Sequence, residues 1–180
     1  PSRYPVVGGD NLFGGHESTW YLLNHGCERI LFLGDPEHAE MNQRYQGYVN
    51  ALKERSIEPD AALLGAIDIT SKAAYDYVNQ HILQHGLNFD GIVCVSDMVA
   101  LGALKALKER YVNIPQDVSI IGYDDIALAE LMHPSLTTIR QNTQQAAEMM
   151  VSELINQLEG HSGASQVVDT RLIVRRSTAQ

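Results

Sequence analysis

Two apolar stretches of this sequence each end in a pair of residues with side-chain oxygens. The stretch IVCV is followed by Ser96 and Asp97, and the stretch VSII leads to Asp124 and Asp125. Short apolar runs of this kind are typical of buried strands in a parallel sheet, and ligands bind such sheets at the carboxyl ends of the strands. Hydroxyl and carboxylate groups at these ends would hydrogen-bond a polar ligand. The pattern therefore predicts a binding site.

The remaining sequence alternates short apolar runs with amphipathic stretches, which predicts the α/β class and a parallel, doubly wound sheet. Predicted strands cover residues 4–7, 29–33, 62–67, 92–95, 118–121 and 136–139, and one or two extended segments cover 167–174. Predicted helices cover residues 15–24, 43–55, 71–85, 98–110 and 143–158. The repeated βα order positions the two polar strand ends side by side.

Capping residues mark several predicted helix ends. Thr70 or Ser71 can cap one helix and Asn142 or Thr143 another, because their side-chain oxygens accept backbone N–H groups. Asp97 is also expected to cap the helix that follows it, which leaves Ser96 as the ligand candidate of that pair. In the second pair, Asp125 fits a cap for the short segment after it better than Asp124 does.

Charge and composition limit the possible partners. The net charge of −9 and the pI of about 5.1 argue against direct contact with a phosphate backbone, and no apolar run reaches the roughly 20 residues that cross a bilayer. Only two cysteines, Cys27 and Cys94, are present, which fits a reducing, cytoplasmic compartment. A basic cluster at Arg171, Arg175 and Arg176 is expected to protect a sheet edge.

Other chemistries have weaker support. The stretch GGDNLFGG lacks the spacing of a phosphate-binding loop, and its glycines fit a tight turn between strand and helix. His81 and His85 have a spacing that can hold zinc, but no third ligand is evident, so charges at a helix end explain them better. Without an activated nucleophile, we predict neither an enzyme nor a resident metal or cofactor.

Five strings give the sequence a family resemblance: DNLFGG, RYQGYVNAL, SDMVALGALKAL, IPQDVSIIGYDD and PSLTTIRQ. In this order and spacing, the chain resembles the effector-binding domain of lactose-repressor (LacI/GalR) family regulators, and its closing LIVRRST is similar to the end of that domain. The resemblance implies a two-lobed core like that of periplasmic binding proteins. It also implies that a helix-turn-helix, a hinge and the first part of the N-terminal lobe lie outside this chain.

The resemblance implies ligand-binding roles for Arg44, Asp124, Ser96, Ile69 and Gln141. Arg44 would clamp hydroxyls or an acidic group, Asp124 would accept two hydroxyl hydrogens, and both are expected to face solvent in the cleft. Ile69 stands where relatives often have an aromatic platform, which argues against an ordinary pyranose or purine there. A surface arginine, a helix cap and a hinge hydrogen bond are the alternatives for Arg44, Asp124 and Gln141.

The resemblance also predicts how the chain is divided and what it does. Residues 10–135 would form the C-terminal lobe, residues 1–9 and 136–160 the crossover elements, and residues 161–180 the return to the C-terminal lobe. The leading hypothesis is an effector-sensing domain that binds a sugar or sugar derivative, dimerises partly through residues 126–132, and acts on operator DNA through its missing N-terminal domain. A sugar-binding protein of a transport system is the alternative, followed by a small α/β enzyme.

Overall fold

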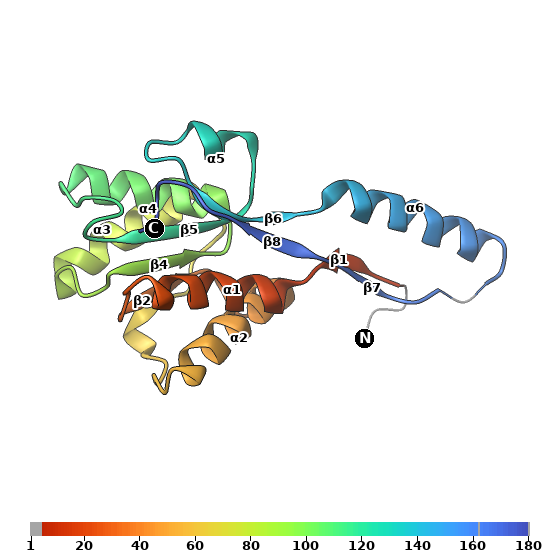
Figure 1. Cartoon of the computed structure of the whole chain (residues 1–180), viewed down its shortest axis with the longest axis horizontal. Coiled ribbons are helices and arrows are strands. Elements are labelled where there is room, and N and C mark those ends of the chain that lie inside the picture. Colours follow the sequence, from red (N-terminus) through yellow and green to blue (C-terminus); the bar gives the residue numbers. More distant parts are fainter. Residues whose placement is uncertain (1–4, 162, 180) are drawn as a thin grey trace.

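The computed structural model describes residues 5–161 and 163–179, which form a sheet-centred body and a projecting arm (Figure 1). The body is built on six strands in the order β3-β2-β4-β5-β6-β8, in which every neighbouring pair is parallel except β6 with β8. These strands are β2 (Ile30–Leu33), β3 (Leu64–Gly65), β4 (Gly91–Cys94), β5 (Ser119–Asp124), β6 (Thr137–Gln141) and β8 (Thr170–Ile173).

Helices cover both faces of this sheet, with α1 and α2 on one side and α3 and α4 on the other (Figure 1). The body contains α1 (Asn11–Asn24), α2 (Ala39–Glu54), the 3₁₀ helix η1 (Ala61–Leu63), α3 (Ser71–His85), α4 (Asp97–Glu109) and the short α5 (Ala127–Leu131). This doubly wound arrangement confirms the predicted α/β fold. It also explains why the strands read as continuous apolar runs, because both faces are buried.

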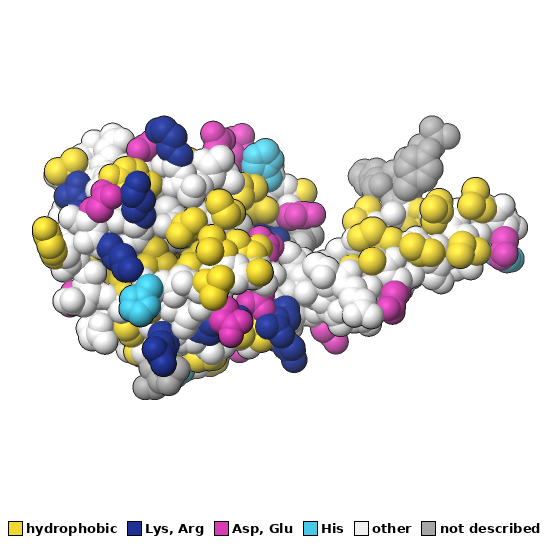
Figure 2. All heavy atoms as spheres, turned by 90° about the horizontal axis from the view of Figure 1, so that it is seen from above, with side chains coloured by type: hydrophobic (Ala, Val, Ile, Leu, Met, Phe, Trp, Pro, Cys, Tyr) yellow, Lys and Arg dark blue, Asp and Glu magenta, His cyan; other side chains and the backbone are white. Residues whose placement is uncertain are grey.

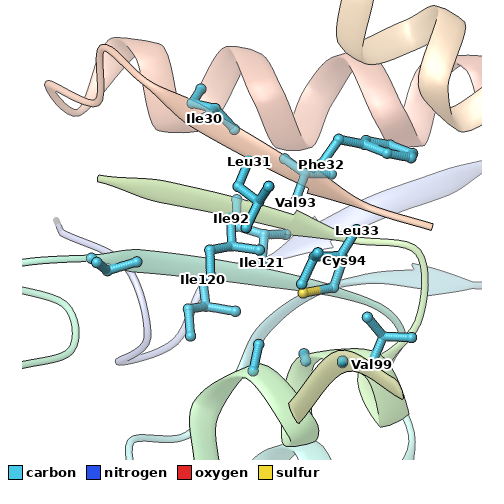
Figure 3. Packing of buried hydrophobic residues seen from close by; sticks show 14 of the residues in the cluster. Ile30, Leu31, Phe32, Leu33, Ile92, Val93, Cys94, Val99, Ile120 and Ile121 are labelled. Atoms are coloured by element: carbon cyan, nitrogen blue, oxygen red, sulfur yellow. The ribbon is translucent and has the colours of Figure 1, made fainter. Parts of the chain in front are cut away.

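The core lies where β2, β4 and β5 adjoin at the middle of the sheet (Figure 3). Phe32, Ile92 and Ile121 are completely buried, as are most of their neighbours along the strands. Val99 on α4 packs from one side, so the helix after β4 is anchored beside the strand end. The rigid core therefore fixes the carboxyl ends of these strands relative to one another.

Glycines bring α1 and α2 into close contact, which corrects their predicted role in a turn. The helix begins at Asn11 rather than near residue 15, because Asp10 caps it by accepting the Phe13 N–H at 2.9 Å. A Cβ atom on Gly15 would lie 2.0 Å from the Arg44 carbonyl oxygen, which only glycine avoids. The glycines therefore allow α1 to pack directly on the backbone of α2.

The arm consists of α6 (Thr143–Leu158) and a parallel two-stranded sheet of β1 (Val7–Gly9) and β7 (Gln166–Val168). Asn142 caps α6 as predicted, by accepting the Gln145 N–H at 3.1 Å. Along α6, one row of hydrophobic side chains stays uncovered (Figure 2). These half-exposed or exposed residues are Met150, Val151, Leu154, Ile155 and Leu158.

Three predicted segments differ from the structure. The strand predicted at residues 62–67 is reduced to the two residues of β3, preceded by η1. The strand predicted at residues 4–7 instead begins at Val7, and Tyr4 lies outside the described residues. Residues 136–139 were assigned to the crossover, but β6 pairs with β5 in the body, so the chain leaves the main sheet only at Asn142. In the described part of the chain, no helix has the length and apolar character needed to span a bilayer.

Candidate ligand-binding site

Arg44 connects the ends of two strands with the first helix of the body. Its Nε donates to Asn11 Oδ1 at 2.8 Å, its Nη1 donates to the Val95 carbonyl, and its guanidinium lies 3.6 Å from the centre of the Tyr123 ring. The side chain is only 5% exposed in this chain, whereas the sequence predicted a solvent-facing arginine. These contacts hold the buried guanidinium in place, and its remaining N–H groups can still donate to a ligand.

Asp124 ends β5 close to Arg44, in a backbone conformation that is rare for a residue with a side chain. Its φ is +109°, and its Oδ1 accepts a hydrogen bond from Gln141 Nε2 at 2.8 Å. Burial raises the pKa of this carboxyl, although Arg44 and Gln141 favour the charged form and Glu40 opposes it. The structure thus brings Arg44, Asp124 and Gln141 together as the sequence anticipated, with a second carboxylate oxygen left to accept a hydroxyl.

Tyr123 is a member of this cluster that sequence reasoning missed. Its ring is 2% exposed and fills the space left by Gly14, where a Cβ would lie 2.6 Å from the ring. Burial raises its pKa to about 12 against the opposing effects of Arg44 and Thr170, so the hydroxyl stays a donor. That hydroxyl has no hydrogen-bond partner of ordinary geometry among the described residues. An aromatic residue directly before the ligand-candidate aspartate was the available signal.

The cap of α4 is Ser96 rather than the predicted Asp97, and the ligand role of Ser96 stays a prediction. Ser96 caps α4, with its Oγ accepting the Val99 N–H at 3.2 Å. Asp97 is fully buried and accepts hydrogen bonds from Ile126 N–H at 2.9 Å and from the Thr138 hydroxyl at 2.6 Å. The cap must be the residue before the first helical residue, and α4 begins one residue earlier than predicted.

Asp125 does not cap α5 either. That helix follows Ile126 and has no side-chain cap, whereas Asp125 accepts hydrogen bonds from Arg140 and, at 2.7 Å, from Arg175. Burial alone would raise its pKa, but the hydrogen bonds and charges of the two arginines outweigh burial and lower it. The prediction that Arg175 protects a sheet edge is therefore wrong, whereas Arg171 is exposed on the edge strand β8.

Two further candidates lie away from the Arg44 cluster. Ile69 is 43% exposed in the turn before α3, next to Thr70, which caps that helix by accepting the Ala73 N–H at 3.1 Å. It shares the carboxyl side of the sheet with the cluster, so its ligand role stays a prediction. His81 is buried, with its Nε2 2.7 Å from Asn88 Oδ1. The described residues contain no group of three side chains that could hold a metal ion.

A doubly wound parallel sheet with a polar cluster at its carboxyl edge, and an arm that carries the strands of a second sheet, defines one lobe of a two-lobed binding protein. The chain belongs to the family of periplasmic binding protein-like domains, whose sequence profile matches residues 19–178. Its similarity to known regulators confirms the resemblance to the lactose-repressor family.

The similar proteins are transcription regulators. The chain is 36% identical to the HTH-type transcriptional regulator RegA of Clostridium saccharobutylicum over 97% of its own length and 53% of that protein. It is 35% identical to the transcriptional repressor CytR of Escherichia coli K12, again over 97% of its length and 52% of that protein. A solved complex of the regulator CelR with cellobiose superposes with a TM-score of 0.92 at 29% identity, covering 97% of this chain and 54% of CelR.

The chain therefore spans about half the length of the curated relatives it matches. These relatives are regulators rather than enzymes, which confirms the prediction of a non-enzymatic chain. The hypothesis of a regulator is favoured over that of a transport protein for the same reason.

Proposed function

We propose that this chain is the effector-sensing lobe of a DNA-binding transcription regulator, and that its effector is a polyhydroxylated small molecule such as a sugar or nucleoside. The observation that carries the proposal is the cluster of Arg44, Asp124 and Gln141 at the carboxyl edge of the sheet. The cluster combines the N–H donors of the Arg44 guanidinium with the second carboxylate oxygen of Asp124, which can accept a hydrogen bond. Two neighbouring hydroxyl groups of a ligand could accept from the first and donate to the second.

The proposed site takes further residues from neighbouring strand ends. Ser96 already accepts one N–H, but its hydroxyl hydrogen can still be donated to a ligand. Ile69 would give an apolar contact without a flat aromatic face. The cellobiose bound by the similar regulator CelR is a ligand of the same polyhydroxylated class. The other wall of the cleft would come from the lobe to which the arm belongs.

Isothermal calorimetry on the complete protein tests the site with defined probes: ribose, cellobiose and cytidine. We expect one of them to bind, and Asp124→Asn to weaken that binding at least tenfold, because an amide offers one acceptor oxygen where the carboxylate offers two. Asp60→Asn is the matched control, since Asp60 is exposed and pairs with Arg29 at the opposite end of the sheet, before β3. Equal affinity in wild type and Asp124→Asn would exclude Asp124 from the site.

Signalling to DNA would require the regions that precede this chain in its relatives. The acidic chain itself, with a net charge of −9, is poorly suited to hold a phosphate backbone. We propose that operator DNA is bound by an N-terminal domain of the cytoplasmic protein. The effector would act by binding one arrangement of the two lobes more tightly than the other. A gel-shift titration of the complete protein with and without effector measures this coupling.

We also propose that the protein dimerises through the face formed by α3, α4 and the end of α5. A groove of about 680 Å³ lies there, lined partly by Tyr75, Leu101 and Met132, and Leu131 beside it is 78% exposed. An apolar groove rimmed by charged side chains is typical of an isologous contact between identical subunits. Sedimentation analysis should show a dimer that Leu131→Glu weakens, whereas a monomeric wild type at high concentration would contradict the proposal.

The transport alternative shares the lobe architecture and the same ligand cluster. A helix-turn-helix encoded further upstream would exclude it, whereas a secretory signal there would support it. Sequencing the gene upstream of Pro1 therefore decides between the two functions.

A further inference from the structure

Asp97 is a buried carboxylate that the proposed binding mechanism does not use. It is fully buried at the start of α4, and no described lysine or arginine is paired with it. Its carboxylate lies against β5, where a Cβ on Gly122 would come within 2.2 Å of Oδ1. The glycine therefore makes room for this group. Because burial of a carboxyl is costly, its hydrogen bonds must offset that cost.

The two hydrogen bonds of Asp97 join its helix to the turn before α5 and to β6. Its Oδ2 accepts the N–H of Ile126, the residue that precedes α5, and its Oδ1 accepts the hydroxyl of Thr138 on β6. The turn between β5 and Ile126 contains two residues with left-handed backbone, Asp124 at φ +109° and Asp125 at φ +56°. Such conformations cost roughly 1–3 kcal/mol each and persist only where the surroundings hold them.

We propose that Asp97 is a positioning residue that holds the turn at residues 124–126, and thereby aims the Asp124 carboxylate at Arg44 and Gln141 while fixing the start of α5. The inference rests on the proposed ligand-binding role of Asp124. Asp97 would then link the proposed ligand site around Asp124 to α5 and the groove beside it. Arg140 and Arg175 hold the same turn from the opposite side through Asp125.

The charge of Asp97 is sensitive to the same turn. Burial raises its pKa to about 6, its hydrogen bonds with Thr138 and Ile126 act against burial, and the charges of Asp124 and Asp125 raise it further. The other ionisable groups facing this region are the Cys94 thiol on β4 and the two arginines that pair with Asp125. The state of the turn and the protonation of Asp97 are therefore linked.

Nuclear magnetic resonance on the ¹⁵N-labelled protein without effector tests the proposal. In the wild type, the Ile126 amide should shift with a midpoint near pH 6, because its N–H bonds to the titrating carboxylate. In Asp97→Asn, whose amide does not ionise, this titration should disappear. In Asp97→Ala, which also removes both acceptor oxygens, the amide-to-Hα coupling of Asp124 should rise as its positive φ is lost, and the Gln141 side-chain amide should change its shift.

Two variants complete the test. Asp90→Asn is the matched control, since Asp90 also accepts two backbone N–H groups, from Glu28 and Arg29, but at the opposite edge of the sheet. It should leave the Asp124 and Gln141 signals unchanged. Thr138→Val removes only one hydrogen bond to the ionised form, so it should move the Ile126 midpoint to higher pH even if Asp97→Ala fails to fold.

The proposal is overturned if Asp97→Ala folds and leaves the Asp124 coupling and the Gln141 shift as in the wild type, or if Thr138→Val leaves the Ile126 midpoint unmoved. Because no effector is added, these outcomes do not depend on ligand binding. Failure of the calorimetric test would remove the proposed function and leave this measurement valid, and the reverse also holds.

Discussion

The ends of β4 and β5 carry similar sequences and use them differently. After β4, the first polar residue, Ser96, caps a helix and the second, Asp97, is buried beneath the neighbouring turn. After β5, the first, Asp124, lies beside Arg44 and the second, Asp125, is held by two arginines. The distance from each pair to the next helix explains the difference, because α4 begins immediately at Asp97 whereas α5 begins two residues after Asp125.

The two buried aspartates also differ in their electrostatics. Among the described residues, Asp97 has hydroxyl and amide donors but no cationic partner, so burial dominates and its pKa is raised to about 6. Asp125 is equally enclosed, with a side chain 3% exposed, but Arg140 and Arg175 lower its pKa. Both residues are aspartates that come second in a polar pair near the end of a strand. Their partners decide which form of the carboxyl the folded state favours.

Arg44→Ala should have the largest effect, since this side chain bonds to the end of β4 and lies beside the end of β5. The substitution leaves the Val95 carbonyl and the Asn11 side chain without their partner and opens a cavity over Tyr123. We expect a loss of about 3 kcal/mol in the free energy of unfolding, measured by urea denaturation. Arg171→Ala, at an exposed edge, should change it by less than about 0.5 kcal/mol.

A solvent-facing Arg44, as expected from the sequence, could be changed to alanine with the fold left intact, whereas the buried side chain predicts a loss of stability. Calorimetry on the variant is informative only after its stability is known. A loss in stability as small as that of Arg171→Ala would show that the buried contacts of Arg44 contribute little.

Asp97 should make the protein less stable as the pH rises from 4 to 6. Its pKa is about 6 in the folded state against an ordinary value of 3.8 for an aspartate, so the folded state binds more protons in that interval. Stability contributed by the protonated form is then lost as the pH passes through the folded pKa. The titration of Asp97 should change the free energy of unfolding by roughly 3 kcal/mol, since one pKa unit corresponds to about 1.4 kcal/mol.

Comparison with Asp97→Asn isolates this effect, because the amide does not titrate. The difference in unfolding free energy between the two proteins should change between pH 4 and 6 and stay constant above pH 7. A constant difference across the whole range would show that Asp97 titrates as an ordinary carboxyl.

Asp125→Ala should give a smaller loss with the opposite dependence on pH. Removing the carboxylate leaves Arg175, which is 14% exposed, without this partner and costs about 2 kcal/mol near neutral pH. Because the folded pKa of Asp125 is lowered, its contribution is present above the ordinary value and is lost as the pH falls through the folded value. The stabilities of wild type and variant should therefore converge in acid. Asp76→Ala, at an exposed pair, should lose at most about 0.5 kcal/mol.

Much of the fold could be predicted from the sequence, because buried parallel strands and amphipathic helices leave strong local patterns. The runs at 29–33, 92–95 and 118–121 all became strands, and the caps at Thr70 and Asn142 were found. The length of β3 was overestimated, because only two residues of the predicted strand pair with β2. The prediction put the point where the chain leaves the body before β6 instead of after it. The pairing of β6 with β5 is a long-range contact that leaves no local signal in the sequence.

The site was predicted less completely, for a related reason. The grouping of Arg44, Asp124 and Gln141 follows from the resemblance together with the parallel sheet. Arg44 was expected in solvent because its burial depends on the α1–α2 glycine contact and the Tyr123 ring, which join distant parts of the chain. A one-residue error in the start of α4 assigned its cap to Asp97 instead of Ser96.

Ser96→Ala should have the smallest effect of the series, about 1 kcal/mol, because it removes a single N-cap hydrogen bond from the Val99 N–H. Ser96→Asn retains an acceptor at the cap without adding a charge beside Asp97, so it should recover most of that loss. If Ser96 also contacts ligand, Ser96→Ala should weaken effector binding beyond its effect on stability. Thermal unfolding and calorimetry on the same samples separate the two roles. An unchanged stability in Ser96→Ala would mean that α4 starts without help from its cap, and that the two strand ends differ less than their hydrogen bonds indicate.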